Sequence, residues 1–417
     1  MRFIHTADIH IDSPLTGLSA YSDAPLETLR SATRDAFTEL INQAISLQVD
    51  FMIIAGDCYD GVWKDHNTGI YFCKEMGRLK KAGIPVYLLY GNHDAENEMT
   101  SKLSYPDNVH IFGTRKPVTF NIDGLKVALH GWSFKEKATT DNLVTFYPSP
   151  VAGLFNIGVL HTALEGNAAH ATYAPCTVDE LLAKGYQYWA LGHVHEFQVW
   201  NGKTTIVFPG SLQGRHIRET GPHGAVLVTT DESGVQSVDR LYVDVLRWQL
   251  LEVNVSACAS LAEVVQTVGK GLEQTAKNAE KPTSVRVVLT GKTSAHGELF
   301  GMERQLRAEI TAITAAIGSD RIWVEKVQVT TTQADQDEQA IKARADALSD
   351  LQCFLEAAER DPEFLKSLQG DLLQLVTKAP LELQSAVPYF KDIRAGDLTG
   401  LVRDVRPGLL AYLSKKG

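Results

Sequence analysis

Five short segments of the sequence place acids, histidines and an asparagine directly after apolar runs. These segments are Asp8-Ile9-His10, Gly56–Asp60 (GDCYD), Gly91–Asp94 (GNHD), His161 and Gly192–His195 (GHVH). Carboxylate, imidazole and amide oxygen together suit divalent ions such as Mn²⁺, Fe²⁺ or Zn²⁺. The candidate ligands are Asp8, His10, Asp57, Asn92, His161, His193 and His195. They are too many for one ion but enough for two ions that share a carboxylate, for which Asp57 is the candidate. Two ions about 3.5–4 Å apart clamp the attacking and leaving oxygens of phosphoryl transfer.

Each segment also has a structural interpretation. A single Asp-x-His is most often a helix cap or a surface turn, and the Gly-Asp, GNHD and GHVH segments could each be a loop. The joint pattern is different, because all five segments occur in order and each follows an expected strand. The glycines at 56, 91 and 192 allow the backbone to turn sharply before the polar side chain. A shared dinuclear metal site explains the whole set.

The elements that must position these residues alternate between strand and helix patterns. Buried strands are expected at Arg2–His5, Phe51–Ala55, Val86–Tyr90, Ile157–Leu160 and Tyr188–Leu191, with helices at Leu26–Leu47, Gly69–Ala82 and Val178–Lys184. Asp123-Gly124 indicates a hairpin between Val118–Ile122 and Lys126–His130. Later strands, at Thr204–Phe208, Ala225–Thr229 and Ser237–Val243, favour antiparallel pairing. Side chains at the ends of parallel strands converge on one rim of a sheet. The fold class is therefore α/β, a mixed sandwich with sheets inside and helices outside.

The pattern changes near residue 245. Strands at Trp248–Val255, Ser284–Thr290 and Arg321–Thr330 alternate with helices at Ser260–Ala279 and Leu299–Ile317, which predicts a second, small α/β domain. A polar linker follows at Thr332–Asp337, and then helical patterns at Gln339–Lys378 and Gly400–Lys415. The first of these carries apolar residues at helical spacing: Ile341, Leu348, Leu351, Phe354, Leu355, Phe364, Leu365, Leu368, Leu372 and Leu375. This stripe could dock on a partner coiled coil or pack on its own domain.

Composition limits the functional classes. The chain has 417 residues, 44% apolar and 22% charged, which is ordinary for a globular protein of two or three domains. The net charge of −10 argues against a polycation that wraps DNA, but not against a nucleic-acid enzyme whose positive charge comes from bound metal. The sequence has no apolar run long enough for a membrane span and no signal-peptide pattern. Five scattered cysteines indicate reduced thiols, and we expect a cytoplasmic protein.

The ordered motifs D-x-H, GD-x-x-D, GNHD, a lone His and GH-x-H resemble the calcineurin-like metallophosphoesterase superfamily over residues 1–240. The opening FIHTADIHIDSPLTGL resembles the DNA-repair exonuclease branch, the SbcD-like proteins. The ADxHxDSP start and the segment PGSLQGRH at Pro209–His216 are most similar to YhaO-type proteins. The resemblance implies a four-layer α/β/β/α sandwich at 1–243, a small α+β capping domain at 244–331 and a C-terminal helical region at 338–417.

The resemblance also implies roles for individual residues. Asp8, His10, Asp57 and His195 would hold one ion, and Asp57, Asn92, His161 and His193 the other. A hydroxide between the ions would attack phosphorus in line. His93 would protonate or stabilise the leaving oxygen, and Asp94 would orient His93 and keep it cationic. No catalytic role is assigned to Asp60. Two divalent ions are expected, Mn²⁺ first, with Fe²⁺ or Zn²⁺ as alternatives.

A cationic patch follows the GHVH segment: Arg215, His216 and Arg218. The patch could clamp a substrate phosphate or form a solvated loop. The resemblance implies a phosphodiesterase that acts on DNA as an exonuclease. The expected partner is an ABC-type coiled-coil ATPase of the SbcC/YhaN kind, bound by the C-terminal helices, and a homodimer is possible. A small-molecule phosphodiesterase or nucleotidase is the alternative enzyme, slightly favoured by the acidic charge. A nuclease-like scaffold subunit of an ATPase complex is the other alternative, which the intact ligand set disfavours.

Overall fold

The computed structural model divides the chain into two compact units, Met1–Gln249 and Leu250–Gly417. It describes residues 1–15, 26–60, 67–95, 104–137, 139–164, 173–299, 302–318, 321–334, 347–379, 387 and 389–413. In the described part, no helix combines the length and apolarity needed to cross a bilayer. The five cysteines all lie in described segments and form no disulfide there. The finer division of the chain at 243/244 and 331/338 stays a prediction.

Two six-stranded sheets form the framework of the first unit. One sheet has the order β12 (Gly234–Tyr242), β11 (Gly224–Asp231), β1 (Arg2–Thr6), β2 (Phe51–Ala55), β3 (Val86–Leu89) and β4 (Val109–Ile111). The other has the order β5 (Val118–Ile122), β6 (Val127–Gly131), β7 (Phe155–His161), β8 (Tyr188–Gly192), β10 (Thr205–Phe208) and β9 (Gln198–Trp200). Strands β1–β4 run parallel, as do β6, β7, β8 and β10, and antiparallel strands complete each sheet.

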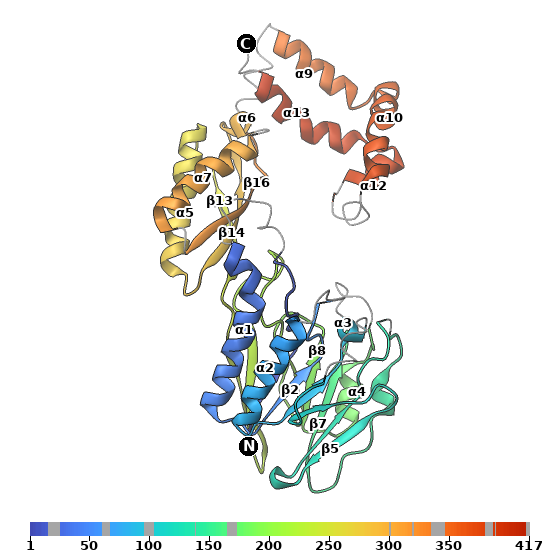
Figure 1. Ribbon diagram of the computed structural model, residues 1–417. Coiled ribbons are helices and arrows are strands. Elements are labelled where there is room, and N and C mark those ends of the chain that lie inside the picture. Colours follow the sequence, from blue (N-terminus) through green and yellow to red (C-terminus); the bar gives the residue numbers. More distant parts are fainter. Residues whose placement is uncertain are drawn as a thin grey trace. The chain divides into compact units, whose positions relative to one another are not determined.

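The side-chain alternation of β1 explains the layers. Phe3 points between the sheets, where it stacks on Phe51 with ring centroids 4.8 Å apart and meets Tyr188 edge-on at 5.3 Å. Ile4 points outward, to a core shared with helices α1 (Leu26–Leu47) and α2 (Asn67–Lys81). Helix α4 (Val178–Ala183) and the short η3 (Leu143–Phe146) belong to a core on the outer face of the other sheet. The predicted α/β/β/α sandwich is confirmed (Figure 1).

A three-stranded sheet follows, and its first strand begins in the last three residues of the first unit and continues into the second. Its order is β13 (Arg247–Asn254), β14 (Thr283–Thr290) and β16 (Ile322–Val329), and the short strands β15 (Lys292–Thr293) and β17 (Thr332–Gln333) form a separate pair. Helices α5 (Leu261–Asn278) and α7 (Glu303–Gly318) share a core with this sheet. The Ser260 hydroxyl caps α5, as its position in the sequence suggests. The helix predicted at Leu299–Ile317 is partly wrong: Leu299 ends the separate short helix α6 (His296–Leu299), and α7 starts only at Glu303, beyond the poor helix former Gly301.

The described residues of the second unit after β17 include four helices: α9 (Ala347–Ala358), α10 (Pro362–Lys378), α12 (Tyr389–Ala395) and α13 (Thr399–Leu413). The apolar stripe predicted here divides in two. Leu365, Leu368 and Leu372 pack against a small core around Val376 and Phe390 within this unit. Two other members of the stripe face solvent: Phe354 is 57% exposed and Leu375 is 62% exposed. Ile341 and the side chain of Leu348 lie outside the described residues.

Candidate metal centre

The predicted ligands lie where the carboxyl ends of the parallel strands of both sheets meet. Asp8 follows β1 by two residues and Asp57 follows β2 by two residues. Asn92 begins a one-turn helix, α3 (Asn92–Ala95), just after β3. From the other sheet, His161 ends β7 and His193 follows β8 directly. The two sheets together therefore supply the side chains of a single cluster.

The described residues of the cluster form three sets of potential metal ligands. Two consist of predicted ligands alone, and the third is His10, Asp60 and His93. In each set, one ligand atom from every member lies within 4.8 Å of the others: Asp8, His10 and His195 in the first set, and Asp57, His161 and His193 in the second. The Nε2 atom of His10 lies 4.0 Å from Asp57 Oδ2, so the sets adjoin. Asn92 joins the second set, with its Oδ1 atom 3.0 Å from His161 Nε2. The structure thus brings all seven residues together, and their division between two ions stays a prediction.

The backbone of the cluster is strained at its polar residues. Asp8, His10, Asp57 and His193 are not glycines, yet their φ angles are +50°, +46°, +53° and +102°. Such conformations cost about 1–3 kcal/mol each and persist where the surrounding structure imposes them. Here the loops after β1 and β2 hold each other by main-chain hydrogen bonds: Asp8 N–H donates to Gly56 O and His10 N–H to Asp57 O, both at 3.0 Å.

Two glycines permit close approach rather than an unusual φ angle. A Cβ atom at Gly192 would lie 2.1 Å from the carbonyl oxygen of Ala55, and one at Gly91 would lie 2.3 Å from Asp57 Oδ1. Of the three glycines that were expected to supply sharp turns, only Gly56 has a positive φ angle, +98°. Gly91 and Gly192 are needed instead because main chain and ligand side chains lie so close to them that no Cβ atom would fit.

The electrostatics of the cluster are those of a site built for a cation. Burial lowers the pKa of His10 to about 3, with help from the Arg215 charge, so its imidazole is neutral. Burial alone would lower the pKa of His161, but Asp57 outweighs it and raises that pKa to about 9. Burial raises the pKa of Asp8. For Asp57, burial is outweighed by His161, and the pKa lies well below its usual range.

The donor set fits divalent metal ions. Asp8 and Asp57 are each only 1% exposed, and buried carboxylates need a nearby positive charge. Oxygen and imidazole nitrogen are the donors that Mn²⁺, Fe²⁺ and Zn²⁺ accept. The sulfur of Cys58, beside Asp57 in the sequence, is not part of the set, because Cys58 packs in the core against α1 and α2, where burial raises the pKa of its thiol.

One predicted role has to be corrected. Asp94 was expected to orient His93, but its two oxygens accept the main-chain N–H groups of Tyr59 at 3.1 Å and Gly91 at 3.0 Å. The carboxylate beside the His93 ring is that of Asp60, whose Oδ1 lies 3.4 Å from both His93 Nδ1 and His10 Nδ1. Asp94 therefore fixes the GNHD turn, and Asp60 contacts the imidazoles.

The three cationic residues after the GHVH segment have different environments. Arg215 is only 14% exposed and turns toward the centre, with Nη1 3.1 Å from Ser13 Oγ and 3.7 Å from Asp60 Oδ1. His216 is partly exposed, and Arg218 is exposed. Only Arg215 is thus built into the cluster. Sequence reasoning missed Glu219, whose carboxylate contacts both His195 and Arg215.

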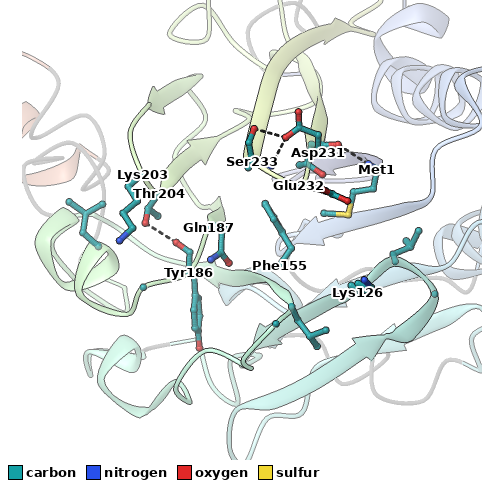
Figure 2. Close-up of a pocket in the computed structure, with 18 residues that line it drawn as sticks. Met1, Lys126, Phe155, Tyr186, Gln187, Lys203, Thr204, Asp231, Glu232 and Ser233 are labelled. Atoms are coloured by element: carbon teal, nitrogen blue, oxygen red, sulfur yellow. Dashed lines mark hydrogen bonds between the residues drawn. The ribbon is translucent and has the colours of Figure 1, made fainter.

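A cavity of about 860 Å³ lies at the other end of the sandwich (Figure 2). Its lining residues precede the parallel strands rather than follow them: Met1 comes before β1, Gln187 before β8 and Thr204 before β10. Several of the polar groups drawn there bond to one another, as when the Thr204 hydroxyl donates to the carbonyl oxygen of Tyr186 at 2.7 Å. The chemistry of the chain belongs to the opposite rim.

The comparisons with known proteins agree with this geometry. Residues 1–197 match the family model of calcineurin-like phosphoesterases, and residues 248–332 match the model described as metallophosphoesterase YhaO, middle domain. The metallophosphoesterase YhaO of Bacillus subtilis is 33% identical over 295 residues, which cover 70% of this chain and 72% of the relative.

Two archaeal relatives are more distant. The DNA double-strand break repair protein Mre11 of Methanopyrus kandleri is 24% identical over 354 residues, 78% of this chain and 70% of the relative. The protein of the same name from Sulfurisphaera tokodaii is 26% identical over 304 residues, 70% of this chain and 74% of the relative. Metallophosphoesterases hydrolyse phosphoester bonds with a dinuclear divalent metal site, and the ligand sets described above suit such a site. This chain belongs to the YhaO family of calcineurin-like metallophosphoesterases.

Proposed function

We propose that this chain is a Mn²⁺-dependent phosphodiesterase that hydrolyses DNA from its ends, an exonuclease of the SbcD/YhaO kind. The observation that carries the proposal is the buried cluster of carboxylates, imidazoles and one amide at the shared rim of the two sheets. The choice of DNA is supported by the similarity to two proteins described as DNA double-strand break repair proteins.

Two divalent ions in the cluster would activate water and neutralise the scissile phosphate. His93 is the group available for the leaving oxygen, because its side chain is 33% exposed while its main-chain N–H is held by Asp57 Oδ1 at 2.9 Å. The main-chain hydrogen bond fixes the position of the His93 backbone. The exposed imidazole can then contact a bound substrate. A proton delivered from this position would let the leaving oxygen depart as a hydroxyl.

Arg215 is the residue we propose for binding the substrate phosphate. A guanidinium can hold two phosphate oxygens at once in a fixed geometry. Asp60 and Glu219 lie within 3.7 Å of its terminal nitrogens, so the side chain is already ordered beside His10 and His195. Arg218, which is exposed, would contact a neighbouring phosphate of a longer substrate, and His216 would contribute at the edge.

A small-molecule phosphodiesterase or nucleotidase is the second candidate. The net charge of −10 favours it, because long DNA is repelled by an acidic surface unless cations are concentrated along its path. The pairing of Arg215 with two carboxylates points in the same direction, since part of its charge is neutralised inside the chain.

We further propose that a coiled-coil ATPase of the ABC type, of the SbcC/YhaN kind, binds the C-terminal helices. Exposed apolar positions on α9 and α10, Phe354 and Leu375, support a helical partner. The reduced thiols support work in the cytoplasm. A homodimer is a further possibility from the resemblance, and sedimentation of the purified chain tests it.

The test compares substrates with one metal-stripped preparation reloaded with Mn²⁺, Fe²⁺ or Zn²⁺. Release of mononucleotides from linear DNA supports the exonuclease, whereas cleavage of only a cyclic dinucleotide and bis-p-nitrophenyl phosphate supports the second candidate. His93→Leu is the matched variant: we expect it to retain its metal ions, measured by mass spectrometry of the bound metal, and to lose turnover by about 100-fold or more. Full turnover of that variant would contradict the leaving-group role.

A further inference from the structure

Glu219 is a buried carboxylate that contacts the metal centre from behind. It is 8% exposed, and its Oε1 atom lies 2.7 Å from His195 Nδ1. Its Oε2 atom accepts the main-chain N–H of Arg215 at 2.7 Å. The two residues that it joins lie on either side of β10, so the carboxylate ties the GHVH loop to the segment that follows that strand.

The contact determines which nitrogen of His195 carries the proton. A carboxylate only accepts hydrogen bonds, so His195 Nδ1 must be the protonated nitrogen of a neutral ring. The lone pair is then on Nε2, which lies 3.9 Å from Asp8 Oδ1 and 3.3 Å from His10 Nε2. Glu219 therefore turns the metal-binding nitrogen of His195 toward the other members of the first ligand set.

The second ligand set is held in a different way. His161 Nδ1 lies 2.9 Å from the carbonyl oxygen of Ala55, which is main chain at the end of β2. No substitution of a side chain removes that carbonyl. The orientation of His195, by contrast, depends on one replaceable carboxylate, so the two metal positions should respond differently to mutation.

We propose that Glu219 is the positioning residue of His195 and that it sets the affinity of the ligand set Asp8–His10–His195 for its ion, leaving the set around His161 unaffected. The inference rests on the metal centre of the proposed function and adds a residue whose task is selective for one of two positions. Removing such a carboxylate partner of a ligating histidine lowers metal affinity about 10- to 100-fold.

Glu219 also contacts Arg215, so the test must distinguish an effect through Arg215 from an effect through His195. Besides the main-chain bond, its Oε1 atom lies 3.6 Å from Arg215 Nη2. A loss of Glu219 could therefore act by displacing the Arg215 side chain rather than by freeing His195. Arg215→Gln removes the guanidinium and keeps Glu219, which makes it the control for that route. Glu232→Gln, at an exposed glutamate of the β11–β12 turn, controls for loss of a negative charge.

The experiment titrates Mn²⁺ into the metal-stripped full chain by calorimetry and counts bound ions by mass spectrometry. We expect two ions in the parent chain and an affinity at least tenfold weaker for one of them in Glu219→Ala. Glu219→Gln should fall between the two, because the amide oxygen still accepts from Nδ1 but carries no charge. Glu232→Gln should bind both ions as the parent does. Arg215→Gln should bind neither ion more weakly, because the guanidinium that it removes is a positive charge, which opposes the binding of cations beside it. Circular dichroism checks that each variant is folded.

A double variant identifies the affected position. Asn92→Ala removes a ligand of the other set, so Glu219→Ala/Asn92→Ala should bind neither ion tightly. If the double variant still binds one ion as tightly as Asn92→Ala alone, Glu219 does not serve the first set and the inference fails. Unchanged binding in Glu219→Ala, or equal loss in Arg215→Gln, also overturns it while the proposed function stands. A parent chain that takes up no divalent ion would overturn the proposed function itself.

Discussion

Asp94 and Asp60 are two carboxylates of the centre, and the groups that they contact show that their roles differ. Asp94 is 2% exposed and accepts two main-chain N–H groups, from Gly91 and Tyr59. Burial raises its pKa to about 7, helped by Asp57, so this side chain is retained at an electrostatic cost. Asp60 is more exposed and lies beside His10 and His93. Asp94 thus shapes the loop, and Asp60 acts on the imidazoles.

Asp94→Ala should destabilise the chain by about 3 kcal/mol, because two buried N–H groups lose their acceptor at about 1–3 kcal/mol each. Asp60→Asn should cost less than about 1 kcal/mol, since its ion pairs are partly solvated. Its turnover should nevertheless fall by about tenfold, because His93 loses the negative charge beside it. Urea unfolding of the metal-free chain and hydrolysis of bis-p-nitrophenyl phosphate measure the two effects. Equal destabilisation by both variants would contradict this division of tasks.

The residues of the centre differ in how far sequence alone reveals them. Asp8, Asp57 and Asn92 could be found because each follows an apolar strand within a short motif, and strand ends converge in a parallel sheet. Glu219 carries no such signal. Its contact with His195 spans 24 positions and passes through β10 and an irregular segment, whose path no local pattern specifies. Asp60 was visible in its motif, but its partner depends on how the loops after β2 and β3 meet.

The elements of the sandwich approach each other closely at the centre, and β8 gives the clearest example. A Cβ atom at Gly192 would lie 2.1 Å from the Ala55 carbonyl oxygen and 2.9 Å from His161 Nδ1. Gly192→Ala should therefore push β8 away from β2, displace His161 and weaken Mn²⁺ binding by tenfold or more, read by calorimetry. Gly124→Ala is the matched control, because no atom lies within 4 Å of its added Cβ. Unchanged metal binding in Gly192→Ala would show that the sheets yield easily.

The interior between the sheets contains a histidine that makes stability depend on pH. His5 is fully buried; its Nδ1 lies 2.9 Å from the Tyr188 hydroxyl and its Nε2 3.1 Å from the carbonyl oxygen of Leu191. Burial lowers its pKa to about 3. Because the folded pKa lies below the unfolded value of about 6.5, protonation favours the unfolded chain. The contribution of neutral His5 to the stability of the folded chain is therefore complete above about pH 6.5, and it is lost progressively as the pH falls toward 3.

His5→Gln should remove this acid dependence. Glutamine can still donate to one partner and accept from the other but takes up no proton. Relative to the variant, the parent chain should lose about 1.4 kcal/mol of stability for each pH unit below 6.5. Urea unfolding of the metal-free chain from pH 7.5 to 4.5 measures the free energy of unfolding of the two proteins. The difference between them isolates His5, because other buried histidines such as His130 contribute equally to both. Parallel pH profiles would contradict the assignment.

Strands and helices with strong periodicity were predictable, and three-residue strands were not. The predicted limits of Phe51–Ala55 and Leu26–Leu47 match β2 and α1, since a buried strand and an amphipathic helix carry their own signal. Strands β4 and β9 were missed, because three residues at a sheet edge are defined by their neighbour rather than by their own pattern. The hairpin at Asp123-Gly124 is confirmed, with Ile122 paired to Val127.

At the scale of the whole molecule, the net negative charge limits which groups can attract DNA. Lysine and arginine total 40 against 50 acids, so the chain as a whole repels a polyanion. Attraction must come from bound ions and from local cations such as Arg215 and Arg218. The sequence alone identified this cationic segment but not its orientation: Arg215 turns inward and Arg218 is exposed. If DNA is the substrate, the dependence of its KM on salt concentration should give the number of phosphate contacts, which should be small.

Salt dependence is therefore the sharpest test of the substrate class. Each cation that neutralises a phosphate releases a counterion, so KM for DNA should rise with salt, with a logarithmic slope of about one per contact. Arg218→Gln should lower that slope by about one. Lys203→Gln, an exposed cation at the opposite end of the sandwich, should leave it unchanged. The parent chain should hydrolyse bis-p-nitrophenyl phosphate with much weaker salt dependence, because that substrate carries one charge. Equal slopes in both variants would remove Arg218 from the DNA path, and a DNA KM that ignores salt would favour the small-molecule enzyme.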